Sequence, residues 1–365
     1  MSAAPILQVE AVAKTFVVRG SLLGRPMASV KAVDDVSFDL RPGETLALVG
    51  ESGCGKSTVG RLVMRLLEPS GGRVVMDGVD VTALPQRQLR PFRRRIQMIF
   101  QDPYASLNPR MNVGQILAEP LMLHGIVPRS ERRARVAELL ELVGLGAHQA
   151  QRYPHEFSGG QRQRIVIARA LAVEPKVIVC DEAVSALDVS IRAQILNLLE
   201  ELQARLGLAY VFISHDLGVV RHVADRIAVM YLGRIVETGP AEAVFSDPRH
   251  PYTRALLSAI PLADPGARRE RLAVQGEIPS PLDPPSGCHF RTRCPYAADL
   301  CRDERPPLED DGVSRATACH FWRTLPALDV LPNEAEPDPR LERLFAAFRD
   351  GAPPAPAMIA PSVSA

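Results

Sequence analysis

Short apolar runs alternate with longer amphipathic segments over the first two thirds of the chain. Strands are predicted where apolar and β-branched residues run together or alternate, at residues 7–18, 44–49, 176–180, 208–214 and 226–231. Helices are predicted where apolar residues recur at helical spacing, at residues 56–67, 112–123, 131–144, 161–173 and 190–206. Buried strands that alternate with helices indicate an α/β fold with a parallel sheet at its centre.

The pattern changes after about residue 255. Proline, arginine and cysteine become frequent, long periodic segments disappear, and the chain from about residue 326 is rich in proline and alanine. We therefore expect an α/β domain over residues 1–255, a small cysteine-rich extension over 256–325 and a disordered tail over 326–365.

Composition narrows the class of protein further. The 365 residues are 46% hydrophobic and 23% charged, with a net charge of +1, so no general attraction to nucleic acid or lipid is expected. The first residues lack the basic start and apolar run of a signal peptide. Since no window holds the roughly 18 apolar residues of a membrane helix, we expect a soluble, cytoplasmic chain that can dock on a membrane protein.

A glycine-rich segment between the strand at 44–49 and the helix at 56–67 matches the phosphate-loop pattern G-x-x-x-x-G-K-[ST]. Such a loop turns successive N–H groups toward the phosphates of ATP, and the following helix adds its positive end. Lys56 would reach the β- and γ-phosphates, and the Ser57 hydroxyl would ligate Mg²⁺. The loop consists of Gly50, Glu51, Ser52, Gly53, Cys54, Gly55, Lys56, Ser57 and Thr58.

Two carboxylates end the apolar strand at 176–180. Asp181 would hold Mg²⁺, directly or through water, and Glu182 would act as general base on the attacking water. Ligands of parallel sheets bind at the carboxyl ends of the strands, which is where these two residues are expected.

Further motifs between and around these two resemble those of ABC ATPases. Their order and spacing along residues 8 to about 240 are those of the family. The matching segments are an adenine-stacking aromatic at Phe16, a Q-loop at Gln101, a signature at Phe157–Gln161, a D-loop at Ser185–Asp188 and a switch histidine at His215.

The resemblance implies a P-loop NTPase fold of ABC type, with a RecA-like core, an antiparallel β subdomain and a helical subdomain at about 102–165. It implies that Gln101 senses the γ-phosphate and Mg²⁺, and that His215 bonds the γ-phosphate. The signature residues would face the ATP held by the phosphate loop of a partner subunit. They are Ser158, Gly159, Gly160 and Gln161.

Four cysteines, Cys288, Cys294, Cys301 and Cys319, lie within one proline-rich stretch. Their spacing is not the C-x-x-C of common zinc sites, yet four thiolates can hold Zn²⁺ or an iron–sulfur cluster. A metal centre would stabilise a segment with little apolar core. His289 and His320 are weaker candidate ligands, and a chance grouping of reduced cysteines is the alternative.

The segments His250–Leu257 and Gly276–Pro281 resemble the C-terminal extension of oligopeptide/dipeptide importer ATPases. Some relatives in that family carry a [4Fe–4S] cluster on cysteines spaced in this way. Val184–Asp188 and Tyr104–Pro109 are similar to the F-type subunit. This resemblance implies a peripheral subunit on the cytoplasmic face of the inner membrane. It would pair with a paralogous ATPase and work with two permease subunits and an extracytoplasmic solute-binding protein.

The sequence leaves two other functions open. The chain could power import of another solute, such as nickel, glutathione or a sugar. It could also be a non-transport ABC ATPase that acts on ribosomes or DNA. That class usually carries two motor domains or a long coiled-coil insertion, which this sequence does not show, and the near-zero net charge argues against a nucleic-acid surface.

Overall fold

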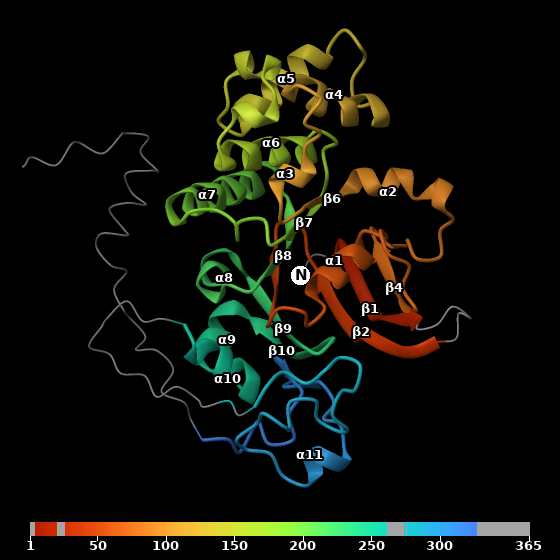
Figure 1. Cartoon of the computed structure of the whole chain (residues 1–365), viewed down its shortest axis with the longest axis vertical. Coiled ribbons are helices and arrows are strands. Elements are labelled where there is room, and N and C mark those ends of the chain that lie inside the picture. The colour runs from red at the N-terminus through yellow and green to blue at the C-terminus, as the bar shows by residue number, and fades with distance from the viewer. Residues whose placement is uncertain (1–3, 20–25, 261–273, 275, 327–365) are drawn as a thin grey trace, which may run out of the picture.

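The computed structural model describes residues 4–19, 26–260, 274 and 276–326 (Figure 1). The expected disordered tail lies, apart from Pro326, outside the described residues. Over the part of the chain that the structure describes, no helix is long and apolar enough to cross a membrane.

A mixed sheet of eight strands forms the centre of the molecule in the described residues. Its parallel strands lie in the order β6 (Ile96–Ile99), β7 (Val177–Asp181), β8 (Ala209–Ser214), β3 (Thr45–Val49) and β9 (Arg226–Tyr231). Three antiparallel strands continue it beyond β9: β10 (Arg234–Pro240), β12 (Ala316–Thr317) and β11 (Glu309–Asp310). The parallel sheet expected from the alternating pattern is confirmed.

A second, antiparallel sheet lies beside the first (Figure 1). Its order is β2 (Pro26–Leu40), β1 (Leu7–Arg19), β4 (Gly71–Met76) and β5 (Val79–Asp80). The strand predicted at 7–18 is therefore confirmed, and this sheet is the antiparallel subdomain that the sequence led us to expect.

The helices fall into three groups. A helical region follows β6. It comprises α3 (Pro103–Ser106), α4 (Val113–His124), α5 (Arg132–Leu142), the 3-10 helices η2 (Ala147–Gln151) and η3 (Pro154–Glu156), and α6 (Gly159–Leu171). Its α4 and α5 extend away from the sheet, and its last helix, α6, packs back against it (Figure 1). Against the sheets lie α1 (Lys56–Val63), η1 (Gln86–Gln88), α2 (Arg90–Arg95), α7 (Val189–Leu206), α8 (Leu217–Val223) and α9 (Ala241–Ser246). The C-terminal part contributes α10 (Pro251–Ser258) and α11 (Leu300–Asp303).

The helix predicted over 56–67 ends earlier, at Val63. Arg65 adopts a positive φ of 50°, outside the helical region. Its guanidinium donates to the carbonyl of Val81 at 2.6 Å and pairs with Glu68. These tertiary contacts draw the chain out of the helix before the apolar pattern ends.

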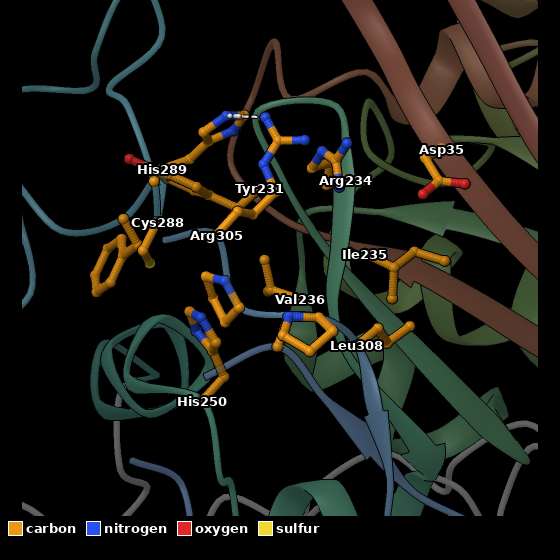
Figure 2. Close-up of a pocket in the computed structure, with 15 residues that line it drawn as sticks. Asp35, Tyr231, Arg234, Ile235, Val236, His250, Cys288, His289, Arg305 and Leu308 are labelled. Atoms are coloured by element: carbon orange, nitrogen blue, oxygen red, sulfur yellow. Dashed lines mark hydrogen bonds between the residues drawn. The ribbon is translucent and has the colours of Figure 1, made fainter. Parts of the chain in front are cut away.

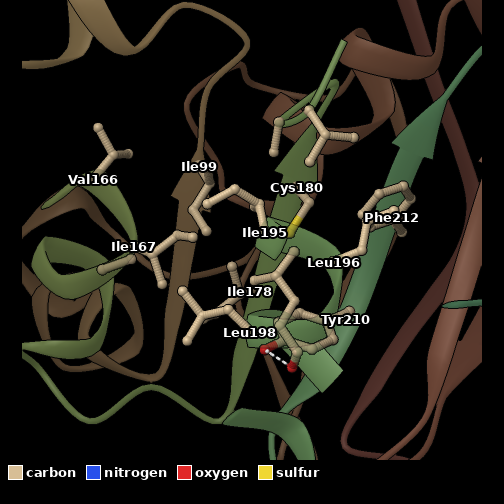
Figure 3. Close-up of a cluster of buried hydrophobic side chains, with 14 of the residues drawn as sticks. Ile99, Val166, Ile167, Ile178, Cys180, Ile195, Leu196, Leu198, Tyr210 and Phe212 are labelled. Atoms are coloured by element: carbon tan, nitrogen blue, oxygen red, sulfur yellow. Dashed lines mark hydrogen bonds between the residues drawn. The ribbon is translucent and has the colours of Figure 1, made fainter. Parts of the chain in front are cut away.

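Side chains of the central strands alternate between two buried clusters, one on each face of the sheet. Ile178 and Cys180 of β7 and Phe212 of β8 face α6 and α7, as Figure 3 shows. Val179 and Val211 of the same strands face α1 and the antiparallel sheet. Because both faces are covered, the strands are apolar throughout, and their carboxyl ends are held rigidly for the site described next.

Candidate functional site

The predicted phosphate loop joins the end of β3 to the start of α1. Gly50, Gly53 and Gly55 have φ values of 150°, 81° and 107°, which favour glycine. A Cβ on Gly50 would stand 2.2 Å from the Met230 carbonyl oxygen, and one on Gly55 would stand 2.2 Å from that of Ala32. The loop therefore packs tightly against neighbouring backbone, and side chains are excluded at these two positions.

Lys56 lies inside this loop. It is 4% exposed, and its Nζ donates to the carbonyl oxygens of Gly50 at 2.7 Å and Glu51 at 2.9 Å. The Cys54 thiol is buried in the core beside it, and burial raises the pKa of that thiol. Cys54 therefore packs the loop against the core, while Lys56 supplies a cation within reach of a phosphate bound there.

Ser57 and Asp181 meet at the junction of α1 and β7. The Ser57 hydroxyl donates to Oδ1 of Asp181 at 2.7 Å. Asp181 is 5% exposed, and burial raises the pKa of its carboxyl, which the hydrogen bond from Ser57 opposes. A buried carboxylate beside a hydroxyl offers the hard oxygen ligands that Mg²⁺ prefers, so the donor set fits that ion.

Two predicted residues, Gln101 and His215, converge on the carboxylate of a third, Glu182. Gln101 follows β6, Glu182 follows β7 and His215 follows β8, so neighbouring strand ends bring them together. Gln101 Nε2 donates to Glu182 Oε2 at 2.8 Å, and His215 Nδ1 lies 3.1 Å from Glu182 Oε1. The Glu182 side chain is 16% exposed, which leaves it open to water. This arrangement suits a general base oriented by two neighbours.

The signature residues lie elsewhere. Ser158 caps α6, where its side chain accepts from the Gln161 N–H and the Gln161 side chain bonds back to Ser158. Gly160 packs under Ile191 of α7, since a Cβ would meet that side chain at 2.5 Å. α6 and α1 pack on opposite faces of the main sheet, so Ser158 and the phosphate loop begin helices on different sides of it.

Phe16 lies on β1, where its partner in β2 is Val30. It is 39% exposed, and Lys14 Nζ stands 5.4 Å from its ring centroid. An exposed aromatic ring on this sheet is free to stack against a planar base.

The four cysteines of the C-terminal segment line one small cavity of about 20 Å³. The Cys288 N–H donates to the Cys301 carbonyl at 2.8 Å. Burial raises the pKa of Cys288 to about 11 and that of Cys294 to about 12. Within the described residues, no group of three or more His, Cys, Asp or Glu side chains is arranged to hold a metal ion.

In the part of the chain that the structure describes, neither candidate histidine is arranged with the cysteines to hold a metal ion. His289 instead lines a larger neighbouring cavity of about 350 Å³, between the β9–β10 hairpin and the C-terminal segment (Figure 2). It faces Arg305 there, and burial lowers its pKa to about 4. His320 does line the cysteine cavity, but its Nε2 lies 3.1 Å from the Glu304 carbonyl.

Sequence reasoning missed two residues that contact the phosphate loop. The Glu51 N–H donates to the Tyr252 hydroxyl at 2.8 Å, and the Glu51 carboxylate pairs with Arg293 at 2.8 Å. Tyr252 and Arg293 lie 201 and 242 residues further along the chain. No local pattern could have revealed either contact.

Comparisons with known proteins agree with this geometry. The model of the ABC transporter family matches residues 33–185, and the model of the oligopeptide/dipeptide transporter C-terminal region matches residues 236–301. The Sinorhizobium fredii protein named "Probable peptide ABC transporter ATP-binding protein y4tS" is 52% identical over 328 residues, which are 90% of this chain and 93% of that protein. The oligopeptide transport ATP-binding protein AppF of Bacillus subtilis is 51% identical over 320 residues, which are 87% and 97% of the two chains.

Among solved structures, an ATP-binding cassette in a dimeric post-hydrolysis state, bound to ADP and Pi, is similar with a TM-score of 0.57. It is 30% identical and covers 64% of this chain and 98% of that one.

Proposed function

This chain belongs to the ATP-binding proteins of ABC transporters, and we propose that it hydrolyses ATP to power import of oligopeptides or dipeptides across an inner membrane. The observation that carries the chemistry is the convergence of Gln101 and His215 on Glu182, beside the Ser57–Asp181 pair. The peptide class of substrate rests on the names of the relatives and on the C-terminal region that matches residues 236–301.

In this proposal Gly50–Thr58 binds the phosphates and Phe16 stacks on adenine. Ser57, Asp181 and Gln101 would hold Mg²⁺, which would neutralise charge on the phosphates. Glu182 accepts the proton of the attacking water, and His215 holds the γ-phosphate and that water in place.

The composite site is the second part of the proposal. Since α6 and α1 lie on opposite faces of the main sheet, residues 158–161 would close over the ATP of a paralogous ATPase subunit. The dimeric state of the similar cassette supports such a pairing. The chain would then lie peripherally on the cytoplasmic face of the membrane, on two permease subunits, and depend on an extracytoplasmic solute-binding protein.

The domain boundaries also belong to the proposal. The ABC domain would span 1–255, with its helical subdomain at about 102–165, and the importer-type extension would span 256–325. The pairing of β12 with β10 supports an extension that packs against the ABC domain and lengthens its sheet.

The cysteine segment would hold a [4Fe–4S] cluster, and its thiols would have to move to bind it, since no group of three or more is arranged around a metal ion in the described residues. What supports this is that all four thiols line one cavity, and that thiolates are the usual ligands of such clusters. A bound cluster would contribute folding energy to a proline-rich segment with few apolar residues. Anaerobically purified protein should be brown and contain iron. Colourless protein with one zinc per chain would favour Zn²⁺ instead, and protein with neither metal would overturn the metal centre.

Uptake of a labelled peptide tests the transport function. Proteoliposomes that hold the complete transporter, with its solute-binding protein, would be compared with the same preparation carrying Glu182→Gln. This substitution keeps the shape and the contacts to Gln101 and His215, yet removes the base, so uptake should fall at least about 100-fold. The matched control is Glu201→Gln, at an exposed glutamate of α7, which should transport normally.

Uptake that is unchanged by Glu182→Gln would overturn the proposed function. ATP-dependent uptake of nickel or glutathione, without uptake of peptide, would show that the transporter imports another solute. Co-purification of the chain with ribosomes rather than with a multi-spanning membrane protein would favour a non-transport ATPase.

A further inference from the structure

The cysteine-rich segment reaches the phosphate loop through one side chain. Arg293 lies between Cys288 and Cys294, and its two terminal nitrogens donate to the two carboxylate oxygens of Glu51 at 2.8 and 2.9 Å. This parallel, two-bond geometry is the strongest form of an arginine–carboxylate contact.

Arg293 is held in place from several sides. It is 8% exposed, and its N–H donates to the Phe290 carbonyl at 2.9 Å. Its guanidinium carbon stands 5.9 Å from the Tyr231 ring centroid and 5.8 Å from that of Phe290, within the range of cation–π contact. Figure 2 shows Tyr231 of β9 close to Cys288. The guanidinium is thus pre-organised by the fold of the cysteine segment.

Glu51 is in turn fixed at three points. Its N–H donates to the Tyr252 hydroxyl, its carbonyl accepts from Lys56, and its carboxylate is paired with Arg293. Two of these three partners belong to the part of the chain beyond residue 250. The backbone that opens the phosphate loop is therefore held by the C-terminal part of the chain as well as by the loop itself.

The positive charge of Arg293 neutralises an acidic side chain in the phosphate loop. Glu51 is an acidic residue in a loop that would bind the highly anionic triphosphate of ATP. The guanidinium neutralises that carboxylate and directs it toward the cysteine-rich segment. Without Arg293, an unpaired negative charge would remain in the phosphate loop and repel the phosphates.

We propose that Arg293 is a positioning residue for ATP: it holds the phosphate loop through Glu51, and so makes ATP affinity depend on the folded state of the cysteine-rich segment. The inference rests on the proposed binding of ATP at Gly50–Thr58. It assigns the C-terminal segment a role in nucleotide binding, in addition to any metal that it holds.

The test compares ATP affinity with turnover in the full chain, assembled with its transporter. Arg293→Ala should raise the Kd and the KM for ATP about tenfold, while kcat at saturating ATP stays close to wild type. Arg293→Lys, which keeps the charge but loses the two-bond geometry, should give an intermediate Kd. The matched control is Arg291→Ala, because Arg291 lies two residues away and its guanidinium donates to Ser286 of the same segment.

The double variant Arg293→Ala/Glu51→Gln gives the decisive comparison. If the unpaired carboxylate causes the loss, removing its charge should recover most of the ATP affinity that Arg293→Ala alone forfeits. If the contact only docks the C-terminal segment, the second substitution would not restore ATP affinity. Arg293→Ala would then lower the melting temperature without changing the Kd for ATP.

A wild-type Kd for Arg293→Ala, or a double variant no tighter than the single one, would overturn the inference while leaving the proposed function intact. A wild-type chain that binds no ATP would overturn the proposed function, and the inference with it.

Discussion

Arg315→Met is expected to loosen the C-terminal segment from the main sheet. Arg315 comes just before β12, and its guanidinium donates to Glu237 of β10 at 2.9 Å. Arg315 is 6% and Glu237 0% exposed, so the pair is fully buried. Glu237 also accepts from the N–H groups of Arg249 and His250, both at 2.9 Å.

Removal of one partner of a buried ion pair leaves the other charge uncompensated, which typically costs about 3–5 kcal/mol. Two backbone donors to Glu237 remain in the variant, so the loss should lie near the lower end of that range. Unfolding entropy is about 2.1 cal/mol/K per residue, so for a chain of 365 residues the corresponding drop in melting temperature is about 4 °C.

Fluorescence of Trp322 provides a local assay. It is the chain's single tryptophan, and Arg249 stands 4.6 Å over its ring, close to the substituted pair. The double variant Glu237→Gln/Arg315→Met should recover much of the loss, because no unpaired charge is then buried. Arg73→Ala, at an exposed pair with Glu10, should leave the transition unchanged. An Arg315→Met variant that unfolds at the wild-type temperature would show that the buried pair does not hold the C-terminal segment to the sheet.

Two further predictions concern the ATP site. Gly55→Ala should abolish ATP binding in a fluorescent-nucleotide titration, since the new Cβ would meet the Ala32 carbonyl at 2.2 Å. Gly43→Ala is the control and should bind ATP normally, because its new Cβ meets nothing within 4 Å. Equal binding by both variants would contradict the tight loop. Ser158→Arg should prevent photolabelling of the partner subunit's phosphate loop by azido-ATP while this chain is still labelled. Loss of labelling in this chain alone would contradict the composite site.

Much of the fold could be predicted from local pattern. Continuous apolar runs located β3, β7 and β8, because both faces of those strands are covered by other elements. The rule that ligands gather at the carboxyl ends of parallel strands located Asp181 and Glu182, whereas Gln101 and His215 were identified by their resemblance to ABC ATPase motifs. The structure brings Gln101 and His215 to Glu182.

Contacts between distant segments could not be predicted in this way. The early end of α1 depends on Arg65 bonding to Val81, which no helical periodicity encodes. β11 and β12 are two residues long, too short to produce a pattern. The pairing of Arg293 with Glu51 is set only when the C-terminal segment folds back on the phosphate loop.

The proposed ATPase depends above all on Glu182 acting as the base for hydrolysis at a site built by Lys56, Ser57 and Asp181. Its most direct test measures ATP binding and phosphate release side by side in the purified transporter with Glu182→Gln. In this variant ATP affinity should stay close to wild type, and phosphate release should be slower by about 10²–10⁴-fold. Phosphate release at the wild-type rate, with ATP bound normally, would contradict this role of Glu182.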